Sequence, residues 1–341
     1  KLSKEEGECF MKAKQWFGLC LAVLFLVIFA FPVLAAEYTI KVGTIQPESH
    51  PDCVLMREVF QKYVEENSGG RIKVELYPNA QLGGDREMAE AVQIGILQMA
   101  LPVTSITANF EKSFNVVELP YLFTTRESAF KALDGELGKE LDKRLLKTGM
   151  MNLGYFENGF RHVTNNKRPV YSPNDLKGMK IRTMEVPPHI AFFKALGANP
   201  TPMSFGELYT ALQQGTVDGQ ENPIVLIHDS RFYEVQKYCS LTGHVFSVVH
   251  ILTNKSFIDG LPADLQKVVE EGARRFVARH REVMPQEEEK LIVELRNKGM
   301  QINDLTAEQK KPFVEAAHSI YNQFKGEIGE DVISLAEKVA K

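Results

Sequence analysis

The sequence predicts an α/β protein with a largely parallel sheet, because segments of strand character alternate with segments of helical character. Residues 38–42 and 71–77 alternate apolar and polar side chains, which is typical of strands buried on one face. The segment between them, from Pro51 to Asn67, is predicted to be a helix that Gly69 and Gly70 end. This order indicates neighbouring parallel strands joined by a helical crossover.

The middle of the chain repeats this order. Asp85 stands where a helix N-cap belongs, ahead of Ala89, Val92 and Ile96 at helical spacing. We expect further strands at 97–103, 151–156 and 179–182, and further helices at 172–176, 188–196 and 207–214.

A long helix is expected near the C-terminus. The amphipathic pattern from Pro262 to Gly299 is interrupted only by Pro285. A helix of that length exceeds what one small lobe needs, so we expect it to run across two lobes and to bend at the proline.

The N-terminal 36 residues predict export. The stretch from Met11 to Lys14 is basic, the run from Phe17 to Leu34 is apolar and uncharged, and Ala35-Ala36 closes the segment. This is the pattern of a cleavable secretory signal peptide, so we assign residues 1–36 to it, with 1–10 as an upstream extension, and expect a periplasmic protein. A membrane anchor is the alternative for the same apolar run.

Composition and motifs argue against several functions. The net charge of −4 gives no basic face for nucleic acid. The chain contains no G-x-S-x-G, H-E-x-x-H, C-x-x-C or phosphate-loop signature. We therefore expect a protein that is not an enzyme and has no catalytic residue, metal or cofactor. Beyond residue 36 the cysteines are Cys53 and Cys239, either two unpaired buried thiols or a disulfide pair.

Several runs carry glycines and polar residues in patterns that core packing does not explain. The most specific are 158–165 (NGFRHVTN), 175–182 (DLKGMKIR) and 211–223 (ALQQGTVDGQENP), accompanied by 77–83, 196–203 and 232–238. In this order they closely resemble the solute-binding proteins of tripartite ATP-independent periplasmic (TRAP) transporters, of the dicarboxylate-binding-protein type. The resemblance extends from about Tyr38 to at least Val283.

The resemblance implies a two-lobed α/β periplasmic-binding-protein fold (type II-like) with a ligand cleft between the lobes. Lobe I would comprise 37–158 plus 248–287, and lobe II 159–247 plus 288–341, with the long helix spanning both. A small organic acid would be captured in the cleft. The closed protein, a soluble monomer, would then dock on the membrane permease subunits of a TRAP transporter driven by an ion gradient. A periplasmic sensor with the same fold is the alternative function.

Four residues are implied to bind the ligand. Arg182 ends an apolar strand, where ligands of open α/β sheets collect, and a guanidinium matches a carboxylate in two parallel hydrogen bonds. The resemblance assigns this clamp to Arg182, a second pocket arginine to Arg161, an amide donor to Asn222 and a packing aromatic to Phe205. The alternatives are a surface arginine, a structural ion pair, a turn residue and a core residue, respectively. We also expect Arg182 to be solvated while the cleft is open.

Further positions bear on specificity. Glu185 stands where the sialic-acid binders of the family have an asparagine, and Val103 where they have an acid, so sialate is not the expected ligand. Glu185 would repel a second ligand carboxylate but accept hydrogen bonds from hydroxyls, which favours a uronate or an aldonate over a C4-dicarboxylate. Asp85 is either another hydroxyl acceptor or a helix cap, and His50 is a further candidate.

Overall fold

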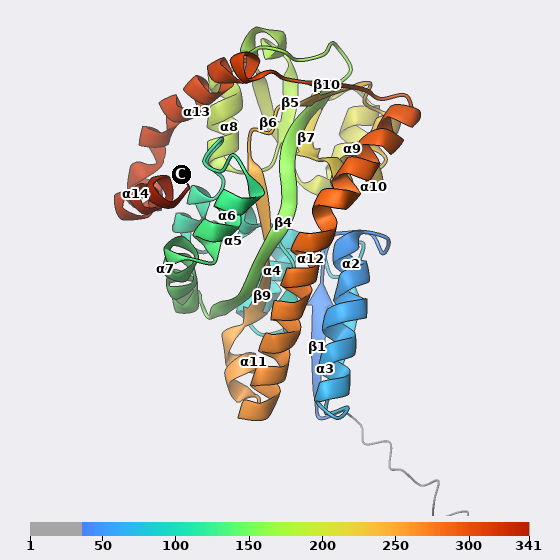
Figure 1. The fold of residues 1–341 in the computed structure, drawn as a ribbon, viewed down its shortest axis with the longest axis vertical. Helices are drawn as coiled ribbons and strands as arrows, with labels where there is room; N and C mark the ends of the chain where they lie inside the picture. The colour runs from blue at the N-terminus through green and yellow to red at the C-terminus, as the bar shows by residue number, and fades with distance from the viewer. Residues whose placement is uncertain (1–35, 341) are drawn as a thin grey trace, which may run out of the picture. The chain divides into compact units, whose positions relative to one another are not determined.

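Residues 36–340 are described by the structure, a computed structural model (Figure 1). The predicted signal peptide therefore lies almost wholly outside the described residues. The elements of the first half are β1 (Tyr38–Gly43), α2 (Pro51–Leu55), η1 (Met56–Gln61), α3 (Lys62–Asn67), β2 (Ile72–Tyr77), α4 (Asp85–Gln93), β3 (Met99–Ala100), α5 (Thr104–Thr107), η2 (Lys112–Val116), α6 (Arg126–Leu133), α7 (Glu136–Leu145), η3 (Leu146–Thr148) and β4 (Met150–Asn165).

The second half begins in the same mixed α/β style and ends in long helices. Its elements are η4 (Pro173–Leu176), β5 (Lys180–Thr183), α8 (Pro187–Ala195), β6 (Asn199–Pro202), α9 (Phe205–Gln213), β7 (Gly219–Pro223), α10 (Ile224–Asp229), η5 (Phe232–Glu234), β8 (Tyr238–Leu241), β9 (Phe246–Asn254), α11 (Lys255–Gly260), α12 (Ala263–Asn297), β10 (Gln301–Asp304), α13 (Ala307–Ile328) and α14 (Glu330–Val339). The α/β class predicted from the sequence is confirmed.

The strands follow the order β2-β1-β3-β9-β4-β7-β5-β6. β1 is parallel to β2 and β3, as the crossover pattern predicts, and β5 is parallel to β6 and β7. β9 and β4 are antiparallel to their neighbours, so the sheet is mixed.

β4 connects the two halves of this sheet. Its residues 150–160 pair with β9, whereas 161–165 pair with β7 on one side and, from Val163 onward, with β8 on the other. One strand thus belongs to both halves, and its change of partners falls beside the predicted lobe boundary at 158–159.

α12 is a continuous helix of 35 residues that contains Pro285 and packs against β4 (Figure 1). Its first part, with Val269 and Phe276, belongs to the hydrophobic cluster around β1 and β2. Its last part, with Leu291 and Leu295, belongs to the cluster around α9 and α10. The predicted helix is therefore present and contributes to two separate cores.

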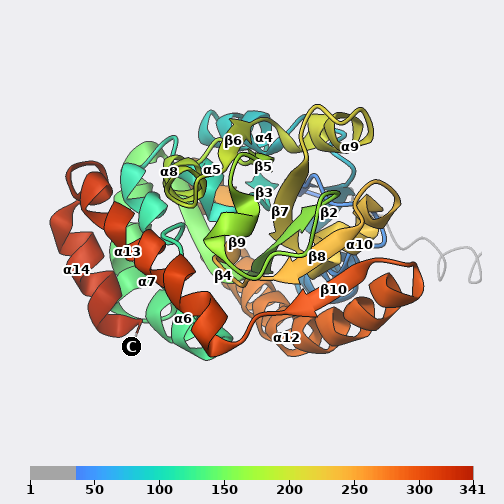
Figure 2. The same ribbon diagram turned by 90° about the horizontal axis from the view of Figure 1, so that it is seen from above.

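The C-terminal helices lie over elements from both predicted lobes. α13 packs against α8 and η2, and α14 packs against α6 and α7. Figure 2 shows α13 and α14 beside α6 and α7. The assignment of 288–341 to lobe II therefore stays a prediction, because α14 contacts helices from the predicted lobe I.

Two details of the first half differ from expectation. Gly84, and not Asp85, occupies the N-cap of α4, and Asp85 is its first helical residue with no capping hydrogen bond. α4 ends at Gln93 because Gly95 adopts a left-handed φ of 80°, which leaves Ile96 in the following turn with 71% of its surface exposed.

Candidate functional site

A cavity of about 820 Å³ lies at the ends of several strands. Segments from both predicted lobes line it: 79–87 and 103–109 on one side, 182–186, 203–209 and 226–232 on the other. Strand ends of an α/β sheet are where its ligands usually bind, so this cavity is the candidate site.

Arg182 is the central cation of the cavity wall. Its side chain is only 2% exposed, and its Nε and Nη2 donate to the Met203 carbonyl at 3.1 and 2.8 Å. Burial lowers the pKa of Arg182 to about 10, although Glu221 opposes this shift, so the guanidinium is charged at neutral pH. The expectation of a solvated Arg182 is corrected: the β6–α9 loop that carries Met203 covers it.

The hydrogen bonds of Arg182 leave one edge of the guanidinium for a ligand. Nε and Nη2 form its side edge, and that edge is turned to the Met203 carbonyl. Nη1 is buried and has no hydrogen-bond partner within residues 36–340. A carboxylate would therefore meet Arg182 end-on, through Nη1 and the second N–H of Nη2.

Arg161 is engaged in a buried ion pair. Its Nε lies 2.5 Å from Oε2 of Glu221, and its Nη2 lies 2.9 Å from Oε1. His244 adds a third member, with Nε2 at 3.0 Å from the same Oε2. Burial alone would raise the pKa of Glu221, but Arg161 and His244 outweigh it and hold this pKa below its usual range.

This arrangement turns the side chain of Arg161 toward partners inside the protein. Its side chain is fully buried, its main partner is Glu221, and it is not among the residues that line the cavity. Its Nη2 donates to Asn222 Oδ1 at 3.0 Å, so it acts on the cavity wall through that amide. Direct ligand contact by Arg161 stays a prediction.

Asn222, Phe205 and Glu185 all line the cavity, as the resemblance implies. Asn222 Nδ2 donates to Gln220 Oε1 at 2.5 Å, which keeps a second N–H of this amide for a ligand. Phe205 opens α9 and packs against Phe232. Glu185 is exposed to the cavity and close enough to Arg182 to favour its charged form.

Asp85 also lines the cavity, at the start of α4. The residue is half-buried, and its Oδ1 is covered without a hydrogen-bond partner among the described residues. Burial, reinforced by the negative charges of Glu87 and Asp52, raises the pKa of Asp85 to about 7.

His50 lies elsewhere and has a structural role, which corrects its candidacy. Pro51 begins α2, so His50 occupies the N-cap, where Nδ1 accepts from the Asp52 backbone N–H at 3.2 Å. The Asp52 carboxylate in turn contacts His280 Nε2 at 2.8 Å. The imidazole thus faces the start of its own helix, and it does not line the cavity.

Comparison with known proteins decides the family. Residues 42–327 match the model of the bacterial extracellular solute-binding proteins, family 7. The chain belongs to this family. It is 34% identical over 283 residues to the 2,3-diketo-L-gulonate-binding periplasmic protein YiaO of Escherichia coli K12, covering 82% of this chain and 86% of YiaO.

Two solved structures share the fold of this solute-binding protein. One is the sugar acid binding protein DctPAm from Advenella mimigardefordensis in complex with galactonate, with a TM-score of 0.86 and 32% identity over 90% of this chain and 98% of the other. The second is a TRAP periplasmic solute-binding protein from Sulfurospirillum deleyianum with bound succinate, with a TM-score of 0.84 and 34% identity over 89% and 99%. The resemblance to TRAP solute-binding proteins and their two-lobed fold is confirmed.

Two features of the site were not foreseen from the solute-binding protein's sequence. Met203 stands in the run 196–203, but nothing in the sequence indicates that its backbone carbonyl holds Arg182. Glu221 and His244 were not proposed as partners of Arg161. The only signal was their type: an acid beside the pocket amide, and a histidine in an apolar stretch.

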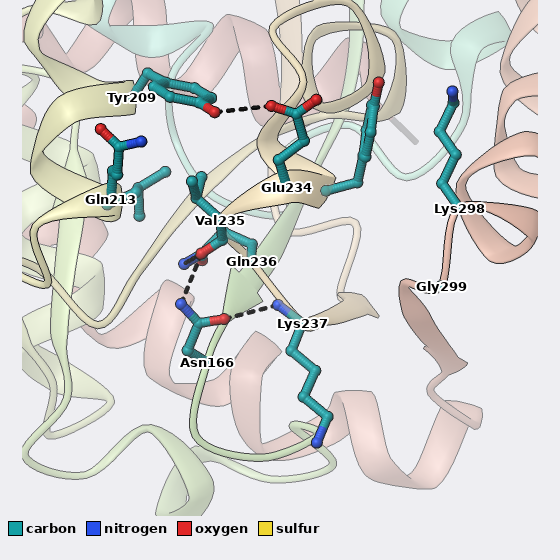
Figure 3. Close-up of a pocket in the computed structure, with 11 residues that line it drawn as sticks. Asn166, Tyr209, Gln213, Glu234, Val235, Gln236, Lys237, Lys298 and Gly299 are labelled. Carbon is teal, nitrogen blue, oxygen red and sulfur yellow. Dashed lines mark hydrogen bonds between the residues drawn. The ribbon is translucent and has the colours of Figure 1, made fainter.

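A second depression, of about 680 Å³, lies on the outer surface and involves Tyr209, Glu234 and Lys237 (Figure 3). Its polar groups bind one another: the Tyr209 hydroxyl donates to Glu234 at 2.9 Å, and Lys237 N donates to Asn166 Oδ1 at 2.8 Å. The central cavity, in contrast, contains a buried donor without a protein partner, which makes it the better ligand site.

Within residues 36–340, no helix is both long and apolar enough to cross a membrane. The same residues contain no cluster of three or more His, Cys, Asp or Glu side chains that could hold a metal ion. Cys53 and Cys239 are both buried and unpaired.

Proposed function

We propose that this solute-binding protein captures a hydroxylated monocarboxylic acid, of the sugar-acid class, in the cavity at Arg182. It then delivers the acid to an ion-gradient-driven TRAP permease. The observation that carries the proposal is the Nη1 edge of Arg182, a buried cationic donor without a partner among the described side chains, at the wall of a cavity large enough for a small acid.

The other charges in the cavity favour a single carboxylate on the ligand. Asp85, Glu87 and Glu185 line it, whereas the one cation besides Arg182 in its lining, Arg86, pairs with Glu90 at 3.0 Å. A second ligand carboxylate would be repelled by the carboxylates of Glu87 and Glu185. Ligand hydroxyls would instead donate to Glu185, because an ionised carboxylate only accepts hydrogen bonds.

The relatives support this choice. The names of YiaO and of the Advenella protein point to a diketogulonate and a galactonate, both of which carry one carboxylate and several oxygen functions. The succinate-bound neighbour shows that the same fold also accepts a dicarboxylate, which makes the comparison of the two acid classes the informative test.

Family membership supports the proposed partner, location and organisation. The protein acts in the periplasm as a soluble monomer after cleavage of residues 1–36, and it docks on permease subunits when closed. Closure moves lobe I (37–158 plus 248–287) against lobe II (159–247 plus 288–341). The predicted boundary at 158–159 is supported by the change of strand partners within β4.

The test begins with native mass spectrometry of the purified protein, which should detect a co-purified acid. Calorimetry on protein freed of ligand by partial unfolding and dialysis then compares D-galactonate, D-galacturonate and succinate at one pH. We expect one of the sugar acids to bind at least about tenfold more tightly than succinate, a difference of about 1.4 kcal/mol. Tighter binding of succinate would contradict the proposed ligand class.

A further inference from the structure

Asp85 has an unusual place among the acids of the cavity. It is the first residue of α4, and its Oδ1 is covered and unpartnered within the described part of the chain. The neighbouring Glu87 and, across the cavity, Glu185 are exposed and so remain hydrated. Asp85 is therefore the cavity acid whose ionised form is least satisfied by its surroundings.

The charged groups around Asp85 are mostly negative. On α4 itself, Glu87 faces it, while the Arg86 side chain turns to Glu90 on the same helix. From α2, the ionised Asp52 acts on it, and Asp52 is already paired with His280 of α12 and contacts His50. Across the cavity stand Glu185 and Arg182, the latter turned toward Met203 and the ligand edge.

One favourable effect opposes these acids. The N-terminus of α4 carries unpaired backbone N–H groups and a partial positive charge, which stabilise an ionised aspartate. Against it stand burial and the negative charges of Glu87 and Asp52, which raise the pKa of Asp85 to about 7. A ligand that brings its own carboxylate into the cavity adds a further negative charge and so makes the ionised form still less favourable.

We propose that Asp85 is a neutral carboxylic acid in the ligand complex and that ligand capture takes one proton from solvent when Asp85 is ionised in the free protein. The neutral acid donates its O–H to a ligand oxygen, while the ligand carboxylate binds Arg182. This inference rests on the proposed function, since it concerns the same cavity and the same class of acid.

The pH dependence follows in sign and size. Below the pKa of the free protein Asp85 already carries the proton and binding is strongest. Above it, each unit of pH costs tenfold in apparent affinity, because one proton must be bound first. For a pKa of about 7, raising the pH from 6.0 to 8.5 weakens binding by about 30-fold.

The experiment is calorimetry of D-galactonate and D-galacturonate from pH 6.0 to 8.5, in buffers of different ionisation enthalpy. Wild type should take up about half a proton per ligand at pH 7 and nearly one at pH 8.5, with the 30-fold loss of affinity. Asp85→Asn, which resembles the neutral acid in shape, should bind at pH 6.0 within about fivefold of wild type and should show no pH dependence.

Glu87→Gln is the matched control, because it removes one of the charges that raise the pKa of Asp85. It should move the midpoint of the affinity loss to lower pH while leaving the affinity at pH 6.0 unchanged, which a purely structural role of Asp85 would not produce. Thermal melts of each variant without ligand check the fold.

The outcomes separate the two proposals. Wild-type affinity that varies less than threefold from pH 6.0 to 8.5 overturns the role of Asp85 alone. So does an Asp85→Asn variant that is folded but loses binding at pH 6.0, because the ionised carboxylate would then be required. Failure of wild type to bind any sugar acid at any pH contradicts the proposed function, and this inference with it.

Discussion

Replacement of Arg182 by alanine should remove most of the affinity for the ligand. The guanidinium is buried, and its Nη1 has no hydrogen-bond partner among the described residues. Truncating one side of a buried, hydrogen-bonded charge pair costs roughly 2–5 kcal/mol, which corresponds to about thirty-fold to several thousand-fold in Kd. Arg182→Lys should recover only part of this loss, because an ammonium cannot form two parallel bonds with one carboxylate.

The same substitution should leave the stability of the ligand-free protein nearly unchanged, because it has one destabilising and one stabilising effect. Alanine leaves the Met203 carbonyl without its two donors, a loss of about 1–3 kcal/mol. It also removes a guanidinium whose pKa is lowered from 12.5 to about 10, a sign that burial disfavours its charge by about 3 kcal/mol. The two terms nearly cancel, so the ligand-free melting temperature should change by only a few degrees.

Calorimetry on wild type, Arg182→Ala and Arg182→Lys, with thermal melts of each ligand-free form, measures both parts together. Affinity of Arg182→Ala within about threefold of wild type would refute the carboxylate clamp. A severe loss of ligand-free stability would show that the two effects on stability do not cancel, but it would not contradict the role of Arg182 in binding the carboxylate.

Four further predictions concern specificity, closure, acid stability and processing. Glu185→Gln should weaken sugar-acid binding by about fivefold, the value of one hydrogen bond, and weaken succinate less in the same calorimetric series; equal loss for both acids would assign Glu185 a structural role. Ligand should reduce the radius of gyration measured by X-ray scattering, because it stabilises the closed state, and an unchanged radius at saturation would exclude lobe movement. His250 is fully buried, and burial lowers its pKa to about 3, so the folded protein rejects a proton that the unfolded chain accepts below about pH 6.5. Lowering the pH from 7 to 5 should therefore cost about 2 kcal/mol of unfolding free energy at this residue, and urea titrations of His250→Gln should show that loss removed. N-terminal sequencing of exported protein should begin at Ala36 or Glu37, whereas a chain that retains Met11 would support the anchored form.

The elements with regular periodicity were predictable from the sequence. β4 was predicted only in part, because its periodicity is interrupted. Strands β1, β2 and β5 lie within a residue or so of the predicted ranges. β4 extends nine residues beyond the C-terminal end of its predicted range. Gly154 and Gly159, with φ of 153° and 117°, lie at shifts of its register against β9. Such bulges break the alternation of side chains, so the continuous strand is invisible as a pattern.

The site was predictable to the extent that residue type and strand position define it. Arg182 follows an apolar strand, and four of the other six candidates line the same cavity. The two that do not line it are Arg161 and His50. Arg161 is held by Glu221, which is distant in sequence. His50 caps a helix that is itself held to α12 by the contact between Asp52 and His280. A single sequence contains no periodic pattern that pairs residues so far apart along the chain.

The buried charges explain why the site should select an anion. Glu221 is shared by Arg161 and His244, and its charge also supports Arg182. Two buried guanidinium groups therefore depend on one buried carboxylate, which leaves one positive charge uncompensated in the covered site. A ligand carboxylate supplies the second anion where Arg182 is covered, and it gains far less from a water-exposed arginine. Relief of the roughly 3 kcal/mol that burial costs Arg182 corresponds to about 150-fold in affinity for an anion over a neutral ligand of the same shape. The Met203 loop that covers Arg182 belongs to the same predicted lobe, so this preference for an anion is built into one wall of the cavity and does not depend on closure.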